Sequence, residues 1–120
     1  MTTEEIIKKN LSFLLDNYEF IFEKKNEGGN YYIFSNKYGS FGYYEWAQFD
    51  DSEFFVKYNS IYKRINLIEY YPKIVANFTI EHKGIRWLFA DTREDFWKMV
   101  SWIVKEEIKN KNTIFGLRIH

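Results

Sequence analysis

The first apolar pattern along the chain has the spacing of a helix. Ile7, Leu11 and Leu14 are three or four positions apart, so they share one face of an α-helix. Thr2 precedes this stripe, and Glu5 follows Thr2 by three residues. This pair is typical of a helix start, where each side chain accepts a hydrogen bond from the other residue's backbone amide. The pattern predicts an amphipathic N-terminal helix whose apolar stripe packs against a sheet.

The spacing of apolar residues then changes to two, and four strand-like runs follow. They are rich in Tyr, Phe and Ile, which favour strands. The short segments between them are polar or contain glycine, as in turns between hydrogen-bonded neighbours. The pattern predicts an antiparallel meander with strands over residues 18–25, 31–35, 41–49 and 53–58.

Aromatic residues occupy both faces of the predicted third and fourth strands. Phe41 and Tyr43 alternate with Tyr44 in the third strand, and Phe54 precedes Phe55 in the fourth. A sheet with one face on helices and the other in water alternates apolar and polar residues more regularly than this. We therefore expect a second face that is either partly covered or displays an aromatic patch.

The middle of the second half has a weaker pattern. Residues 60–71 fit either a fifth strand or a helix, and we expect a strand to about Leu67. Pro72 suits the first position of a helix, where its missing N–H is not needed. Gly84 suits the left-handed residue that follows a helix end. These signals predict a short helix from Pro72 that ends near His82.

A long helix and a short tail complete the pattern. Asp91 or Thr92 can cap the helix, and acidic residues follow in its first turn. The buried stripe of this helix is predicted from residues at helical spacing: Phe96, Val100, Ile103, Val104 and Ile108. We place Trp97 and Trp102 off the centre of that stripe. The tail from Thr113 can add a last edge strand.

These elements predict one α+β domain over residues 1–120, with an antiparallel sheet of four to six strands. The N-terminal helix and one or two C-terminal helices pack on one face of that sheet. The chain is 46% apolar and 22% aromatic, which is enough for a single core in 120 residues.

Charge and composition narrow the function classes. The net charge is zero, although residues 1–60 carry 6 Lys and Arg against 10 Asp and Glu, and residues 61–120 carry 11 against 7. A nucleic-acid-binding domain has a stronger basic excess, so we expect no nucleic-acid partner. The sequence has no cysteine, no signal-peptide pattern and no apolar run of transmembrane length. We expect a cytoplasmic protein with no membrane partner.

A search for catalytic and metal-binding patterns finds little. The two histidines, His82 and His120, have no metal-ligand spacing, and no serine lies in a nucleophile elbow. Neighbouring carboxylates such as Asp50 and Asp51 can act as acid and base, but Asp-Asp-Ser between strands is also ordinary turn chemistry. We expect no catalytic residue, no metal and no cofactor, and hence a protein that is not an enzyme.

The meander combines aromatic and acidic residues, which suits contact with a basic partner protein. The alternative is that these rings are core residues. The candidate partner-binding residues are Tyr43, Tyr44, Glu45, Trp46, Phe49, Asp50, Asp51 and Glu53. A second candidate surface, in which arginine can stack on tryptophan, consists of Lys83, Arg86, Trp87, Arg93 and Trp97.

The overall layout resembles that of the small α+β immunity proteins of bacterial toxin systems, in chain length, aromatic-rich sheet and acidic surface residues. The most distinctive segments are GYYEWAQF at 42–49 and GIRWLF at 84–89. The zero net charge departs from the strongly acidic immunity proteins that oppose nucleases. The resemblance implies a non-enzymatic protein that binds a cognate toxin domain and neutralises it by occlusion.

Two other hypotheses remain open. A small-ligand-binding or enzymatic domain requires an aromatic pocket between sheet and helices, with inward Tyr hydroxyls or carboxylates. A homodimer can use the meander face as its interface, which the size of the protein in solution tests.

Overall fold

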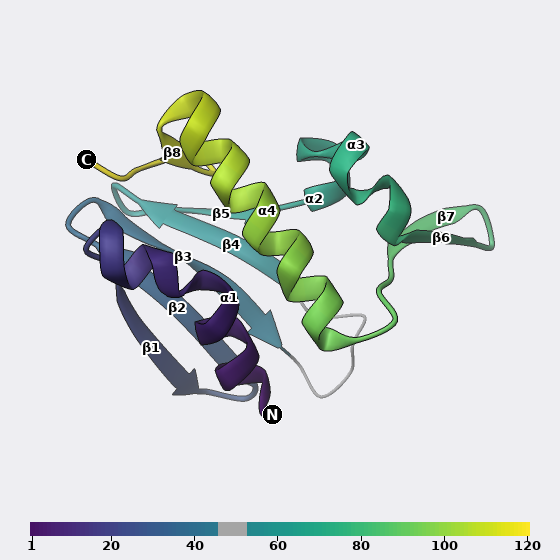
Figure 1. Ribbon diagram of the computed structural model, residues 1–120, viewed down its shortest axis with the longest axis horizontal. Coiled ribbons are helices and arrows are strands. Elements are labelled where there is room, and N and C mark those ends of the chain that lie inside the picture. The colour runs from purple at the N-terminus through teal and green to yellow at the C-terminus, as the bar shows by residue number, and fades with distance from the viewer. Residues whose placement is uncertain (46–52) are drawn as a thin grey trace.

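The computed structural model is an α+β fold whose two long helices lie side by side on one face of an antiparallel sheet (Figure 1). It describes residues 1–45 and 53–120, apart from the side chain of Trp87. The helices are α1 (Thr3–Asn17) and α4 (Arg93–Lys111). The sheet has five strands in sequence order: β1 (Ile21–Asn26), β2 (Asn30–Asn36), β3 (Gly39–Glu45), β4 (Glu53–Tyr58) and β5 (Ile61–Ile65). The predicted fold class is confirmed.

The start of α1 is the predicted capping box. The Oγ1 atom of Thr2 accepts a hydrogen bond from the amide of Glu5 at 3.2 Å, and the Glu5 carboxylate accepts one from the amide of Thr2 at 3.3 Å. Two of the backbone donors that a helix start leaves unpaired are satisfied in this way. The stripe of Ile7, Leu11 and Leu14 is fully buried against the sheet.

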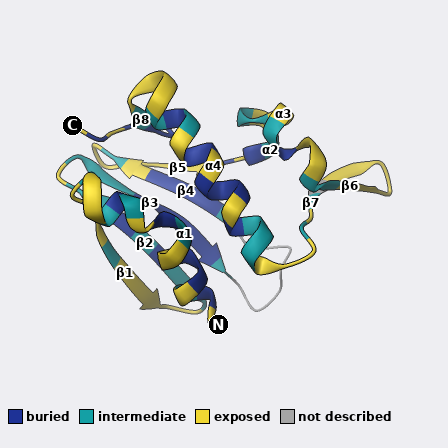
Figure 2. Cartoon of the chain, viewed as in Figure 1, coloured by how far each residue is buried: buried dark blue, intermediate teal, exposed yellow. Residues whose placement is uncertain are grey.

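The core lies between the sheet and the helices, and Figure 2 shows the buried residues along the inner sides of α1 and α4. Phe34 of β2 stacks on Phe41 of β3 with 5.3 Å between ring centroids. Val56 of β4 is fully buried beside them. The strand register places these three residues on the same face, as alternation predicts.

The ambiguous segment after β4 contains both a strand and helical turns. After β5, Asn66 caps the short helix α2 (Leu67–Tyr70) by accepting hydrogen bonds from two amides. Pro72 then occupies the first position of α3 (Pro72–Val75), as predicted, and the 3₁₀ turn η2 (Ala76–Phe78) follows. These turns pack on the helical side of the sheet, where Leu67 and Val75 are buried.

The prediction of a helix that runs from Pro72 to near His82 is wrong beyond residue 78. The chain forms a hairpin of β6 (Thr79–His82) and β7 (Ile85–Leu88), which we call the arm. Lys83 and Gly84 have φ values of 53° and 77°, so both occupy the left-handed region at the hairpin turn. The glycine signal therefore marks a turn between strands and not a helix end.

The C-terminal tail forms its own small hairpin and does not extend the main sheet. Its strands are β8 (Thr113–Ile114) and β9 (Leu117–Arg118). Ile114 and Leu117 are fully buried, and the side-chain amide of Asn36 in β2 donates a 2.7 Å hydrogen bond to the carbonyl of Arg118. The tail thus covers one end of the core beside α4.

Candidate functional site

The structure separates the residues of the first candidate surface. Tyr43 faces the helices, where its ring centroid lies 5.1 Å from that of Trp97 and 4.8 Å from that of Phe54. Tyr44 faces the opposite side of the sheet, as does Glu53, its partner in the strand register. Tyr43 is therefore a core residue and does not share a surface with Tyr44.

The remaining members of that set divide in the same way. Glu45 is on the helical side, where its carboxylate accepts a 3.5 Å hydrogen bond from the hydroxyl of Tyr32. Burial and the neighbouring Glu45 carboxylate raise the pKa of Tyr32 to about 12. Trp46, Phe49, Asp50 and Asp51 lie outside the described residues.

A row of aromatic side chains crosses the face of the sheet opposite α1 and α4, which we call the open face. The row consists of Tyr31, Tyr44, Phe55 and Tyr62, one from each of β2 to β5. Tyr31 stacks on Tyr44 with 4.1 Å between centroids, and Phe55 stacks on Tyr62 with 5.7 Å between centroids. The edge of Phe55 also meets Tyr31 at 6.2 Å, so the rings form one continuous layer.

Gly42 makes this layer possible. A Cβ at Gly42 would lie 2.9 Å from Cζ of Phe55 and 2.2 Å from the carbonyl oxygen of Tyr32. The Phe55 ring therefore lies flat over the backbone of β3, where any larger residue would displace it. This packing explains why Phe55 is buried although it lies on the face without long helices.

The edges of the open face, in contrast, expose apolar side chains. Tyr62 in β5 is 52% exposed and Ile21 in β1 is 71% exposed, whereas Tyr44 and Phe55 in the middle are only 7% and 6% exposed. The open face thus has a closed aromatic centre and accessible apolar margins. Aromatic residues therefore occupy the second face, but Tyr62 is the one member of the row that the described structure leaves exposed.

The hydroxyl of Tyr62 is held by a small polar network. It donates a 2.7 Å hydrogen bond to Oε1 of Glu53, whose other carboxylate oxygen forms an ion pair with Arg64. Burial of the hydroxyl and its bond to Glu53 raise the pKa of Tyr62 to about 12. The bond to Glu53 and the stack on Phe55 therefore fix the position of a side chain that is half exposed.

Sequence reasoning did not select Tyr31, Phe55 or Tyr62. The alternation in each strand was visible, but it does not say which face the helices cover. Cross-strand register is what joins these rings to Tyr44.

The second candidate set is also dispersed. Trp97 is a core residue, 3% exposed, between Tyr43 and Phe54. Arg93 donates hydrogen bonds to Thr3 and to the carbonyl of Met1, which ties the start of α4 to the start of α1. The last three residues of the set, Lys83, Arg86 and Trp87, lie on the arm.

The arm projects from the body of the domain (Figure 1). Its register pairs Ile80 with Trp87 and His82 with Ile85. Ile80 and Ile85 are 47% and 54% exposed, and Phe89 just after the arm is 49% exposed. Leu88 at the end of β7 packs against the core, whereas Ile80 and Ile85 add accessible apolar surface to the arm.

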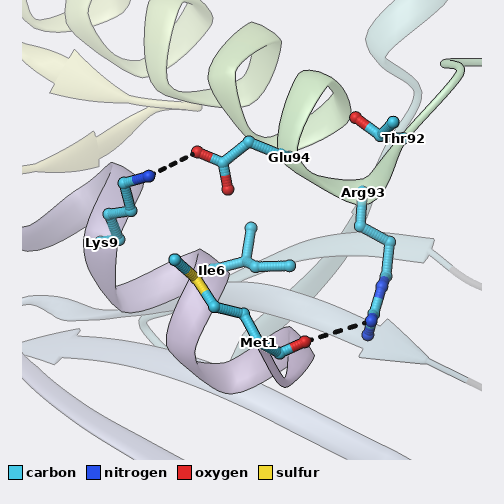
Figure 3. Close-up of a pocket in the computed structure, with 6 residues that line it drawn as sticks. All are labelled: Met1, Ile6, Lys9, Thr92, Arg93 and Glu94. Atoms are coloured by element: carbon cyan, nitrogen blue, oxygen red, sulfur yellow. Dashed lines mark hydrogen bonds and ion pairs between the residues drawn. The ribbon is translucent and has the colours of Figure 1, made fainter.

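Figure 3 shows the hollow where α1 and α4 begin, of about 430 Å³. Lys9 forms an ion pair with Glu94 at 3.0 Å on one side of it, and Arg93 contacts Met1 on the other. The Lys9 ammonium lowers the pKa of the Glu94 carboxyl. The charged side chains that line this hollow, Lys9, Arg93 and Glu94, all bond to neighbours and so link the start of α1 to the start of α4.

The interface between sheet and helices is filled by side chains where the structure describes it. The cavity there is about 10 Å³ and is lined by apolar and aromatic residues such as Leu11, Phe34 and Trp97. Such a space holds at most one water molecule. It offers no support for the hypothesis of a ligand pocket between these layers.

The described part of the chain contains no group of three His, Asp or Glu side chains that can hold a metal ion. His82 is on the exposed arm, and the ring of His120 lies 6.0 Å from that of Tyr18. Over the same residues, no helix is both long and apolar enough to cross a membrane.

In comparisons with known proteins, no protein-family model, no curated protein and no solved structure matches this chain.

Proposed function

We propose that the chain is a non-enzymatic protein-binding domain and that its open face contacts the partner. The observation that carries this proposal is the exposure of Tyr62 in β5 and Ile21 in β1, the two edge strands, on the sheet face that α1 and α4 leave free. A tyrosine at the edge of a packed aromatic layer provides a rigid contact area at low cost in side-chain entropy.

The closed centre of the open face favours a protein partner over a small ligand. Tyr44 and Phe55 each pack against Tyr31 and are buried, so the centre of the open face presents little ring surface to a small molecule. A broad, shallow surface of this kind suits another protein surface. The charged pair of Glu53 and Arg64 beside Tyr62 supplies the polar rim that such interfaces have.

The partner that we propose is a toxin domain, which the chain neutralises by covering a functional surface of the toxin. This step rests on the resemblance of the layout to bacterial immunity proteins, together with the flat contact surface. It requires no catalytic group in the chain, because binding alone blocks the toxin.

The test compares two lysine substitutions in β5. Tyr62→Lys changes the open face, whereas Ile61→Lys changes the neighbouring residue, which is 56% exposed and points to the other side of the strand. Both side chains are exposed, so both variants should melt within a few degrees of the wild type. Each tagged protein is used to capture partners from cells that carry the toxin system.

The proposal expects a partner that the wild type and Ile61→Lys retain and that Tyr62→Lys loses. Producing the captured partner alone should arrest growth, and co-production of the wild-type chain should restore it. Equal capture by Tyr62→Lys and the wild type would exclude the open face as the binding surface. A captured partner whose production does not harm cells would exclude the toxin assignment.

A further inference from the structure

A groove runs along the outer side of the helical layer, between α1 and α4. Its volume is about 410 Å³, and we call it the helix groove. It is lined by Lys9 and Asn10 of α1 and by Lys98, Ser101, Trp102 and Lys105 of α4. The groove is on the opposite side of the sheet from the open face, so its function is independent of the one proposed above.

Trp102 is exposed, although the apolar residues close to it in the sequence of α4 are buried. Its side chain is 53% exposed, whereas Val100 and Ile103 are 1% and 0% exposed. It is therefore outside the core, and no ring contact with another described residue holds it in place. An accessible tryptophan in a groove is the side chain most often found as an energetic anchor of a protein interface.

Lysines flank this tryptophan along one stripe of the helix. Lys98 is four residues before Trp102 and Lys105 three residues after it, so the three side chains share one face of α4. Among the described residues, neither lysine has an ion-pair partner. The ammonium group of Lys105 lies over the Phe13 ring at 5.0 Å, which orients it without neutralising it.

The acidic residues around the groove offset this positive charge only in part. Glu94 is paired with Lys9 at 3.0 Å, and Lys98 also contributes to lowering the pKa of its carboxyl. Since neither Lys98 nor Lys105 is in an ion pair with a described residue, the groove presents two cations with an apolar ring between them. Its complement is an anionic segment that carries an apolar side chain.

We propose that the helix groove binds an acidic peptide segment of a protein, with one apolar or aromatic side chain of that segment against Trp102. Lys98 and Lys105 pair with carboxylates on either side of that contact. A peptide fits better than a nucleic acid because the two lysines flank a single ring, whereas a nucleic-acid site has to follow a backbone with one negative charge per nucleotide. The zero net charge of the chain gives no long-range attraction to such a backbone.

The probe is a short fluorescein-labelled peptide of Asp and Glu with one central Phe. Its binding to the protein is measured by fluorescence anisotropy at about 0.15 M salt. Lys98→Glu combined with Lys105→Glu should weaken binding by about tenfold or more, because it reverses both contacts. The control combines Lys73→Glu and Lys83→Glu, which changes the net charge equally at exposed residues elsewhere. It should weaken binding by less than about twofold.

Trp102→Ala separates specific binding from general charge attraction. This substitution should weaken binding of the peptide that contains Phe and leave binding of an all-acidic peptide of the same length unchanged. The proposal is overturned if the wild type does not bind the peptide, or if the Lys98 and Lys105 reversal and the control reversal weaken peptide binding equally. It is also overturned if single-stranded DNA binds the groove more tightly than the peptide. None of these variants changes the open face, so failure here leaves capture by the open face intact.

Discussion

Gly42 is the position at which one added methyl group should disturb the open face most. In Gly42→Ala, the new Cβ would lie 2.2 Å from the carbonyl oxygen of Tyr32 and 2.9 Å from the Phe55 ring. The ring can rotate away, but the Tyr32 carbonyl belongs to the neighbouring strand of the sheet. The strands must therefore separate locally, and the aromatic row loses its middle.

The expected cost follows from that geometry. Overpacking in a well-packed region costs about 1–3 kcal/mol. Because the clash is with backbone, the cost of this substitution should be about 3 kcal/mol. The gain from replacing a flexible glycine, about 0.5–1 kcal/mol, offsets part of it. We expect a net loss of about 2 kcal/mol in the free energy of unfolding, or about 5–12 °C in Tm for a chain of this length.

Urea unfolding followed by circular dichroism measures this loss, with Gly84→Ala as the control. Gly84 has a φ of 77°, but a Cβ there meets nothing within 4 Å, and the residue lies at the tip of the arm. Its substitution strains the turn by about 1 kcal/mol and leaves the main sheet unchanged. A Gly42→Ala protein whose stability lies within about 0.5 kcal/mol of the wild type would refute the packing described for the open face.

Three further perturbations test separate parts of the structure. The raised pKa of Tyr62 favours the neutral phenol in the folded state. The contribution of this phenol to stability is therefore complete below about pH 10 and is lost as the pH rises to about 12. The phenolate absorbance of the wild type minus that of Tyr62→Phe should show one titration near 12, and a titration near 10 would contradict the hydrogen bond to Glu53. Glu107 is 3% exposed, and one of its carboxylate oxygens has no hydrogen-bond partner among the described residues. Glu107→Gln should therefore raise the free energy of unfolding by about 1 kcal/mol at pH 7. A fall in Tm would refute this prediction. Ile85→Ser on the arm should leave Tm within about 2 °C of the wild type because the side chain is exposed; a larger fall would mean that the arm packs on the body.

The long helices and the meander were predictable because each has a strong local signal. The capping box of Thr2 and Glu5 and the cap at Thr92 mark helix starts, and both helices begin where expected. The runs that form β2, β3 and β4 are rich in Tyr, Phe and Ile, and their turns contain residues that tolerate positive φ or cap their own backbone, such as Asn36. Local chemistry was sufficient for these elements.

The arm and the tail were not predictable in the same way. Thr79–His82 is too short for its alternation to outweigh the helix signals of Pro72 and Gly84. In the tail, Ile114 and Leu117 alternate poorly, and their hairpin depends on packing beside α4. The wrong prediction for the arm and the open question of the tail both concern short segments whose conformation depends on contacts far along the chain.

The candidate surface was only partly predictable for a related reason. The sequence shows that Tyr43 and Tyr44 point to opposite sides, but only the position of α4 decides which ring packs against the helices; both rings are buried. Trp97 illustrates the same limit, since the aromatic cluster with Tyr43 and Phe54 widens the buried stripe of α4 beyond its expected centre. Exposed surface is a property of the packed layers and has no local signal.

The most direct test of the open face as the binding surface is hydroxyl-radical footprinting of the chain with and without its captured partner. Ile21 and Tyr62 are exposed on the open face, and Trp102 is exposed on the helical layer as an internal reference. The account predicts that the partner protects Ile21 and Tyr62 and leaves Trp102 as reactive as before. Protection of Trp102 alone, with Ile21 and Tyr62 still reactive, would contradict it.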